Sequence, residues 1–146
     1  MTRAQAGLTI RAMMRSRRSA ALSTQLAIAD GWAYGALVTV TTDFDDSPLM
    51  LFSDLSDHSR NIKADPRASL LFERASGHRN PQRGPRVTIL GNLKKTNKPE
   101  HHARFLARHP EAERYAGFAD FHFYRMTIDR AHWVGGFARA QWLSGR

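Results

Sequence analysis

The sequence contains no cysteine, which excludes disulfides, thiolate metal sites and cysteine nucleophiles. It also has no apolar run approaching the roughly 20 residues that cross a bilayer, and no apolar stretch follows the N-terminal arginines as in a signal peptide. No Gly-x-Ser-x-Gly elbow is present, so that type of serine-nucleophile catalysis is excluded. These absences predict a cytoplasmic protein without a membrane partner.

Acidic residues are missing from two long stretches. None precedes Asp30, and none lies between Arg74 and Pro99, where there are seven lysines and arginines. The net charge of +9 favours anionic partners, and arginine suits phosphate or carboxylate recognition, although a solvated basic surface is the plainer alternative. Basic and aromatic residues do not alternate as in single-strand binding platforms, so a nucleic-acid partner is not favoured.

The length of 146 residues predicts one domain, residues 1–146, with a core large enough to fold alone. Residues 3–22 have the spacing of a basic amphipathic helix, with Ile10, Met13 and Met14 on its apolar face. We assign residues 1–18 to this N-terminal element, whose first residues can be disordered.

Six segments have the alternation or the short apolar runs of strands. They are residues 20–27, 36–41, 49–52, 68–72, 86–95 and 121–129. The Asp30-Gly31 pair predicts a hairpin turn, and Gly91 predicts a bulge or a close backbone approach. Three consecutive strands joined by tight turns favour a meander that curls into a barrel.

The remaining chain is expected to be helical or irregular. A short helix is predicted at residues 61–64, and a longer one at 97–118 that is broken at His109-Pro110 and resumes at 111–115. Residues 73–84 are expected to form a loop. Three histidines fall on the longer helix (His101, His102 and His109), but their spacing fits no zinc motif, so we expect no structural metal.

Residues 48–73 carry the most informative pattern. An apolar strand ends in Ser53, and His58, Ser59 and Arg60 follow at the start of a helix. Hydroxyls, an imidazole and a guanidinium beside the free N–H groups of a helix start can hold a phosphate. The alternative is a capped loop with surface charges.

This segment, from the strand through His-Ser-Arg-Asn to Asp-Pro-Arg, resembles the FMN-binding split-barrel family related to pyridoxamine 5'-phosphate oxidase. The branch with haem-utilisation proteins is the most similar one. Further matches lie at residues 84–91, 104–111 and 133–139. The resemblance implies a mainly β fold, a six-stranded antiparallel split β-barrel with flanking helices. It also implies a homodimer with two FMN molecules at its interface.

The resemblance further implies a set of cofactor-binding residues. Ser53, His58, Ser59 and Arg60 would contact the FMN phosphate. A strand containing Ala36, Val38 and Thr39 would pass beneath the flavin ring, Arg86 would reach that ring, and Trp133 would lie near it. The alternatives are barrel lining for the strand residues, salt bridging for Arg86 and core packing for Trp133. No catalytic residue is evident.

The function expected from the resemblance is that of an FMN-binding flavoprotein, a flavin-dependent oxidoreductase with an unknown small-molecule substrate. The alternative is a haem-binding or haem-utilisation protein that uses the same barrel, with His58, His78 or His132 as the candidate histidine. A basic nucleic-acid-associated module ranks third. The segments that bind pyridoxal phosphate in the oxidase branch have no match in this sequence.

Overall fold

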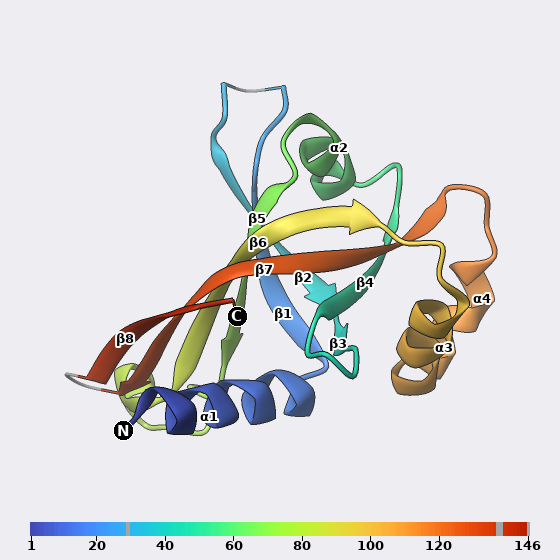
Figure 1. The fold of residues 1–146 in the computed structure, drawn as a ribbon. Coiled ribbons are helices and arrows are strands. Elements are labelled where there is room, and N and C mark those ends of the chain that lie inside the picture. Colours follow the sequence, from blue (N-terminus) through green and yellow to red (C-terminus); the bar gives the residue numbers. More distant parts are fainter. Residues whose placement is uncertain (29, 137–138, 146) are drawn as a thin grey trace.

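The computed structural model describes residues 1–28, 30–136 and 139–145. A single curled antiparallel sheet forms its body (Figure 1). Its strands are β1 (Ser19–Gln25), β2 (Ala33–Thr39), β3 (Thr41–Thr42), β4 (Pro48–Ser53), β5 (Arg67–Glu73), β6 (Arg86–Lys95), β7 (Phe121–Gly136) and β8 (Arg139–Ser144). The helices are α1 (Arg3–Ser16), α2 (Asp57–Ala64), α3 (Pro99–Arg108) and α4 (Glu113–Ala116), with 3-10 turns at Pro81–Arg83 and Pro110–Ala112.

The strands pair in the order β2-β1-β5-β6-β7-β4-β3, and β8 pairs with the second half of β7. Only Val40 separates β2 from β3, so the two ends of this order are consecutive in the chain. The sheet therefore curls back on itself. The mainly β, antiparallel barrel class with flanking helices is confirmed.

The strand count differs from the predicted six. β3 continues β2 after Val40, and the predicted final strand extends to Gly136, so Trp133 lies within β7. β8 was not predicted, because its short sequence, half polar and half apolar, has no clear alternation. The matching segment at residues 133–139 includes residues 137 and 138, which lie outside the described residues.

The N-terminal helix is shorter than predicted. α1 ends at Ser16, and residues 20–22 belong to β1, where every second side chain from Ala20 to Thr24 is buried. Pairing with both β2 and β5 outweighs the helix propensity of the alanines. The start of α1 has a reciprocal capping box between Thr2 and Gln5.

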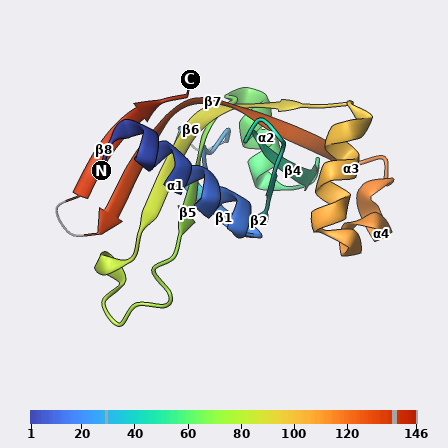
Figure 2. The same cartoon turned by 60° about the horizontal axis from the view of Figure 1, so that its bottom comes forward.

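The main core fills the inside of the curled sheet. α1 contributes Ile10, Met13 and Met14 to this core, and α2 contributes Ile62. Figure 2 shows α1 lying across the strands at one end of the barrel. The buried Asn61 of α2 donates from Nδ2 to Thr24 Oγ1 at 3.0 Å and so fixes α2 against β1.

A second, smaller core lies outside the barrel beneath α3 and α4. Leu49 and Leu51 of β4 point into it and meet Phe105 of α3, while Met50 and Phe52 point into the main core. β4 is therefore buried on both faces, which explains its uninterrupted apolar sequence.

Two histidines, one in α3 and one directly after it, fix this helix against the rest of the chain. His101 bridges Thr96 Oγ1, 2.6 Å from Nδ1, and Asp43 Oδ2, 3.1 Å from Nε2. His109 Nε2 lies 2.8 Å from the carbonyl oxygen of Val40. Nowhere in the described ranges do three or more histidines, aspartates and glutamates gather as metal ligands. Within the same ranges, no helix is long and apolar enough to cross a bilayer.

The prediction for Gly91 is confirmed. The register between β6 and β7 shifts at Leu90 and Gly91, which marks a bulge. A Cβ on Gly91 would clash with the carbonyl oxygen of Thr127 and lie 2.7 Å from Cγ of Met126. Only glycine fits this close approach.

Candidate functional site

The predicted phosphate-binding residues lie together where β4 leads into α2. Ser53 is the last residue of β4, Ser56 caps α2, and His58, Ser59 and Arg60 form the first turn of the helix. Helix α2 starts earlier than predicted, at Asp57, because the Ser56 hydroxyl accepts from the backbone N–H of Ser59. The structure therefore brings all four residues into one junction.

The hydroxyls of this junction already have partners. Ser53 Oγ donates to Asp120 Oδ2 at 2.8 Å and accepts from the Leu55 N–H. Ser56 Oγ donates to the Ser53 carbonyl at 2.7 Å and lies 2.9 Å from Ser59 Oγ. These contacts hold the turn between strand and helix in shape.

His58 acts here as a packing group. Its ring meets Phe52 edge-on, with centroids 4.4 Å apart. Burial lowers the pKa of His58, and the nearby Asp57 carboxylate opposes this only in part. The imidazole is therefore neutral near pH 7 and supplies no positive charge to a phosphate.

A basic pocket of about 430 Å³ opens beside the junction, and we call it the α2 pocket. Its cations are Arg60, Lys63 and Lys95. Arg60 is exposed and lies 3.7 Å from Asp57, and Lys95 lies 3.7 Å from Asp54. These loose contacts leave the cations able to turn toward an anion.

Sequence analysis did not single out Lys63, Lys95 or the pocket's tyrosine, Tyr124. Lys95 and Tyr124 meet only because β6 pairs with β7 in this register. Burial raises the pKa of Tyr124, as does the charge of Asp54, so the phenol is neutral. No local motif could have placed these residues beside Arg60.

The other predicted contacts do not converge on the α2 pocket. Val38 is buried in the main core, Ala36 packs against that core, and Thr39 points outward. The Arg86 guanidinium donates to the carbonyls of Gln82 and Gly84, at 2.9 and 3.1 Å, and so fixes its own loop. Trp133 is a core residue.

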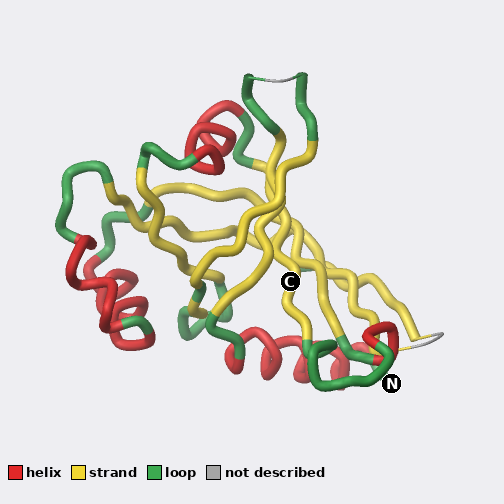
Figure 3. The backbone as a smooth tube through the Cα atoms, turned by 180° about the vertical axis from the view of Figure 1, so that it is seen from behind, coloured by secondary structure: helices red, strands yellow, loops and turns green. Residues whose placement is uncertain are grey.

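A second surface runs across the outer face of the sheet. Directly paired residues on six neighbouring strands form one row, which we call the outer row: Leu37, Ala21, Leu71, Thr88, His132 and Trp142. Leu37 is 82% exposed, Trp142 53% and Leu71 39%. Figure 3 shows the helices at the margins of the view with the strands between them.

His132 is the polar group of the outer row with a free ligand-binding atom. Its ring stacks on Trp142, with centroids 4.5 Å apart, and the guanidinium of Arg130 lies 5.8 Å from the same indole. In the described part of the chain, neither ring nitrogen of His132 has a hydrogen-bond partner. Of the three candidate haem histidines, His58 packs on Phe52 and His78 lies exposed in the loop before β6, so His132 alone belongs to this row.

The curled antiparallel sheet, its flanking helices and the strand order define a split β-barrel protein of the class that includes pyridoxamine 5'-phosphate oxidase-like proteins. Within that class the chain belongs to the CREG β-barrel family, whose model matches residues 2–146. The resemblance to the haem-utilisation branch of split barrels is also confirmed.

Known proteins extend this result. The chain is 31% identical over 139 residues to the non-canonical heme oxygenase HOZ, chloroplastic, of Arabidopsis thaliana, covering 93% of this chain and 42% of that protein. A heme binding protein from Mycobacterium smegmatis is 27% identical with a TM-score of 0.88, over 99% of this chain and 60% of that one. A putative pyridoxamine 5'-phosphate oxidase from Listeria innocua shares the fold, with a TM-score of 0.66 and 10% identity over 88% of this chain and 97% of that one.

The chain thus spans less than two thirds of the length of the Arabidopsis and Mycobacterium relatives.

Proposed function

We propose that this protein binds haem on the outer face of its sheet, with His132 as the residue that faces the iron. The observation that carries the proposal is the imidazole of His132, which stacks on Trp142 in an exposed, largely apolar row and whose nitrogens have no hydrogen-bond partner among the described residues. The names of the Arabidopsis and Mycobacterium relatives support haem as the ligand.

The residues of the outer row suit the chemistry of haem. A porphyrin needs flat apolar contact, which Trp142 offers, and the imidazole of His132 would hold its iron. The carboxylates of haem need cations at the edge, and Arg130 lies beside Trp142. Bound haem would supply the iron chemistry, while the chain would orient the macrocycle and shield one of its faces.

FMN is the second candidate ligand, as the oxidase branch of the class suggests. The observation that favours it is the α2 pocket, where Arg60, Lys63 and Lys95 surround enough space for a phosphate. The role of Arg60 in phosphate binding therefore stays a proposal, whereas His58 would contribute packing and no charge. Any redox chemistry would come from the flavin.

A homodimer fits the same outer face. The half of the outer row on β2, β1 and β5 exposes Leu37, Ala21 and Leu71, and apolar area of this kind is stabilised when a second copy covers it. The half on β6, β7 and β8 carries His132 and Trp142. We assign the first half to the partner subunit and the second half to the ligand, which would then lie at the edge of the interface.

Absorbance titration of the purified protein tests the proposal. One series adds haem and a parallel series adds FMN. A Soret band that shifts and saturates at about one haem per chain supports the proposal. Saturable binding of FMN but not of haem would contradict the haem proposal and support FMN as the ligand. Binding of neither ligand would contradict both proposals.

A further inference from the structure

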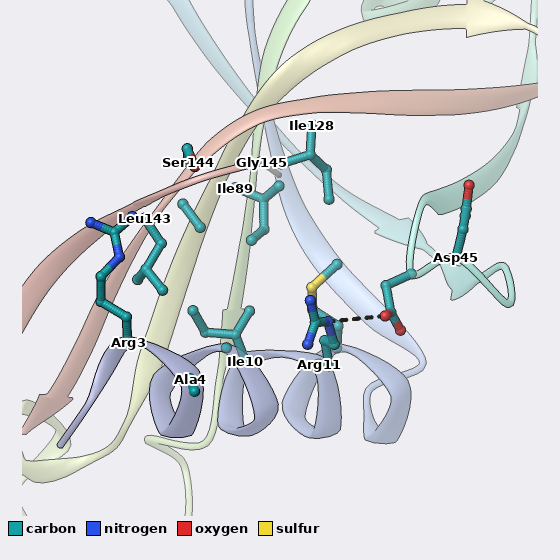
Figure 4. Close-up of a pocket in the computed structure, with 14 residues that line it drawn as sticks. Arg3, Ala4, Ile10, Arg11, Asp45, Ile89, Ile128, Leu143, Ser144 and Gly145 are labelled. Atoms are coloured by element: carbon teal, nitrogen blue, oxygen red, sulfur yellow. Dashed lines mark ion pairs between the residues drawn. The ribbon is translucent and has the colours of Figure 1, made fainter.

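A second cavity lies on the opposite side of the sheet from the outer row. It has a volume of about 340 Å³, at the lower end of the range for small-molecule sites. One wall is α1, and the other is formed by β6, β7, β8 and the following Gly145 (Figure 4). We call it the α1 pocket.

The wall opposite α1 is apolar. Ile89, Ala131 and Leu143 are direct partners across β6, β7 and β8, so their side chains share the inner face of the sheet. Ile10 of α1 faces them across the pocket in Figure 4, and Ile128 also lines it. A ligand here would bury hydrocarbon against hydrocarbon, which is favourable in proportion to its apolar area.

The acidic groups of the α1 pocket are already neutralised. Asp46 pairs with Arg11 at 3.2 Å and with Arg15 at 2.7 Å. Asp45 pairs with Arg125 at 3.0 Å. Three arginines thus form ion pairs with two carboxylates, so neither aspartate requires a further cation.

Arg3 is the unmatched charge. It lies in the first turn of α1, at the far end of the pocket from Arg11 and beside Leu143 in Figure 4. Within residues 1–28, 30–136 and 139–145 its guanidinium has neither an ion pair nor a hydrogen bond. The positive end of the α1 dipole adds to the attraction for an anion at this place.

From these observations we propose that the α1 pocket binds an amphipathic carboxylate, with its anionic head on Arg3 and its alkyl body between Ile10, Ile89 and Leu143. A nucleotide or another polyanion would need more than one free cation, and a neutral hydrocarbon would leave Arg3 unused. This site is separate from the proposed haem site, because the two lie on opposite faces of the same strands.

Isothermal titration calorimetry with decanoate, kept below its micelle concentration, tests the proposal. We expect saturable binding of one decanoate per chain and weaker binding of the neutral analogue decanol. Arg3→Ala should weaken decanoate binding about tenfold, as expected for loss of a charge-assisted contact. Arg79→Ala, which removes the same charge from an exposed loop outside the pocket, should leave the affinity unchanged.

A second variant fills the pocket. Gly7 lines it on α1, and a Cβ there meets only Arg11 Nη1, at 3.8 Å, so a larger side chain can be accommodated. Gly7→Leu also favours helix formation, by about 1 kcal/mol, and should therefore keep the fold while it abolishes decanoate binding. His132→Ala should leave decanoate binding unchanged.

Three results would overturn the proposal. The first is an absence of saturable decanoate binding by the wild-type chain. The second is binding that survives both Arg3→Ala and Gly7→Leu, and the third is decanol binding as tightly as decanoate. Loss of haem binding in the titrations described above would leave these outcomes unaffected, so the two proposals fail independently.

Discussion

The imidazole of His132 stacks on the indole of Trp142, with ring centroids 4.5 Å apart and planes 29° apart. The two residues are direct partners in the pairing of β7 with β8. This contact fixes the orientation of an imidazole whose nitrogens remain available within the described ranges. It also makes the proposed haem site depend on β8, the strand that sequence analysis did not predict.

The proposed homodimer predicts that an acidic residue in the outer row separates the subunits. Leu37→Glu would place a carboxylate in an apolar contact, where it would be desolvated without a partner. Sedimentation velocity should show a dimer for the wild type and a monomer for the variant. Leu55→Glu is the control, since Leu55 is equally apolar and 71% exposed but lies outside the row. A monomeric wild type, or a dimer that survives Leu37→Glu, would contradict the assignment.

The α2 pocket predicts that Arg60→Ala weakens FMN binding. Loss of one charge-assisted phosphate contact should reduce the affinity about tenfold. Fluorescence quenching of FMN measures the effect, and Arg114→Ala on α4 is the charge-matched control. An affinity that is the same in both variants would place the phosphate elsewhere.

The burial of His58 implies that the free energy of unfolding depends on pH. Burial holds its pKa below 6.5, so the unfolded chain takes up this proton first as the pH falls. The contribution of His58 to the free energy of unfolding is therefore fully present above pH 6.5. It declines as the pH falls from there through the lowered pKa of the folded state. Urea unfolding at pH 7.5 and 5.0 should show a smaller loss for His58→Gln than for the wild type. An NMR titration that gave His58 a pKa of 6.5 or higher would refute this account.

The contact that Phe105 makes should account for much of the free energy that holds α3 to the barrel. Its side chain is fully buried between β4 and α3, and Phe105→Ala should lower the free energy of unfolding by about 3–5 kcal/mol. Phe118→Ala removes a ring that is 58% exposed and should change stability far less. Urea denaturation compares the two variants. Equal losses would mean that the second core contributes little.

Much of the fold was readable from local patterns. The strands that became β4, β5 and β6 were predicted nearly in place, because each is a short apolar or alternating run bounded by turn residues. The bulge at Gly91 followed from a glycine inside a strand pattern. Residues 20–22 fell in both a predicted helix and a predicted strand, and the strand is confirmed, because pairing with two neighbouring strands outweighs the local helix preference of alanine.

The site was only partly readable, since its roles depend on contacts between distant segments. The strand and the helix that form the β4–α2 junction were predicted, but the hydroxyl of Ser53 bonds to Asp120, 67 residues away. Lys95 meets Tyr124 only through the register of β6 and β7. The outer row likewise draws single residues from six strands, and no sequence motif records that alignment.

A haem titration of three proteins tests the central claim most directly: the wild type, His132→Ala and His78→Ala. His78 is an exposed histidine in the loop before β6, so its variant controls for non-specific imidazole binding. We predict a shifted Soret band for the wild type and His78→Ala, and a band for His132→Ala that is altered in position and at least about tenfold weaker in affinity. An unchanged band and affinity in His132→Ala would contradict the assignment of the haem site to the outer face.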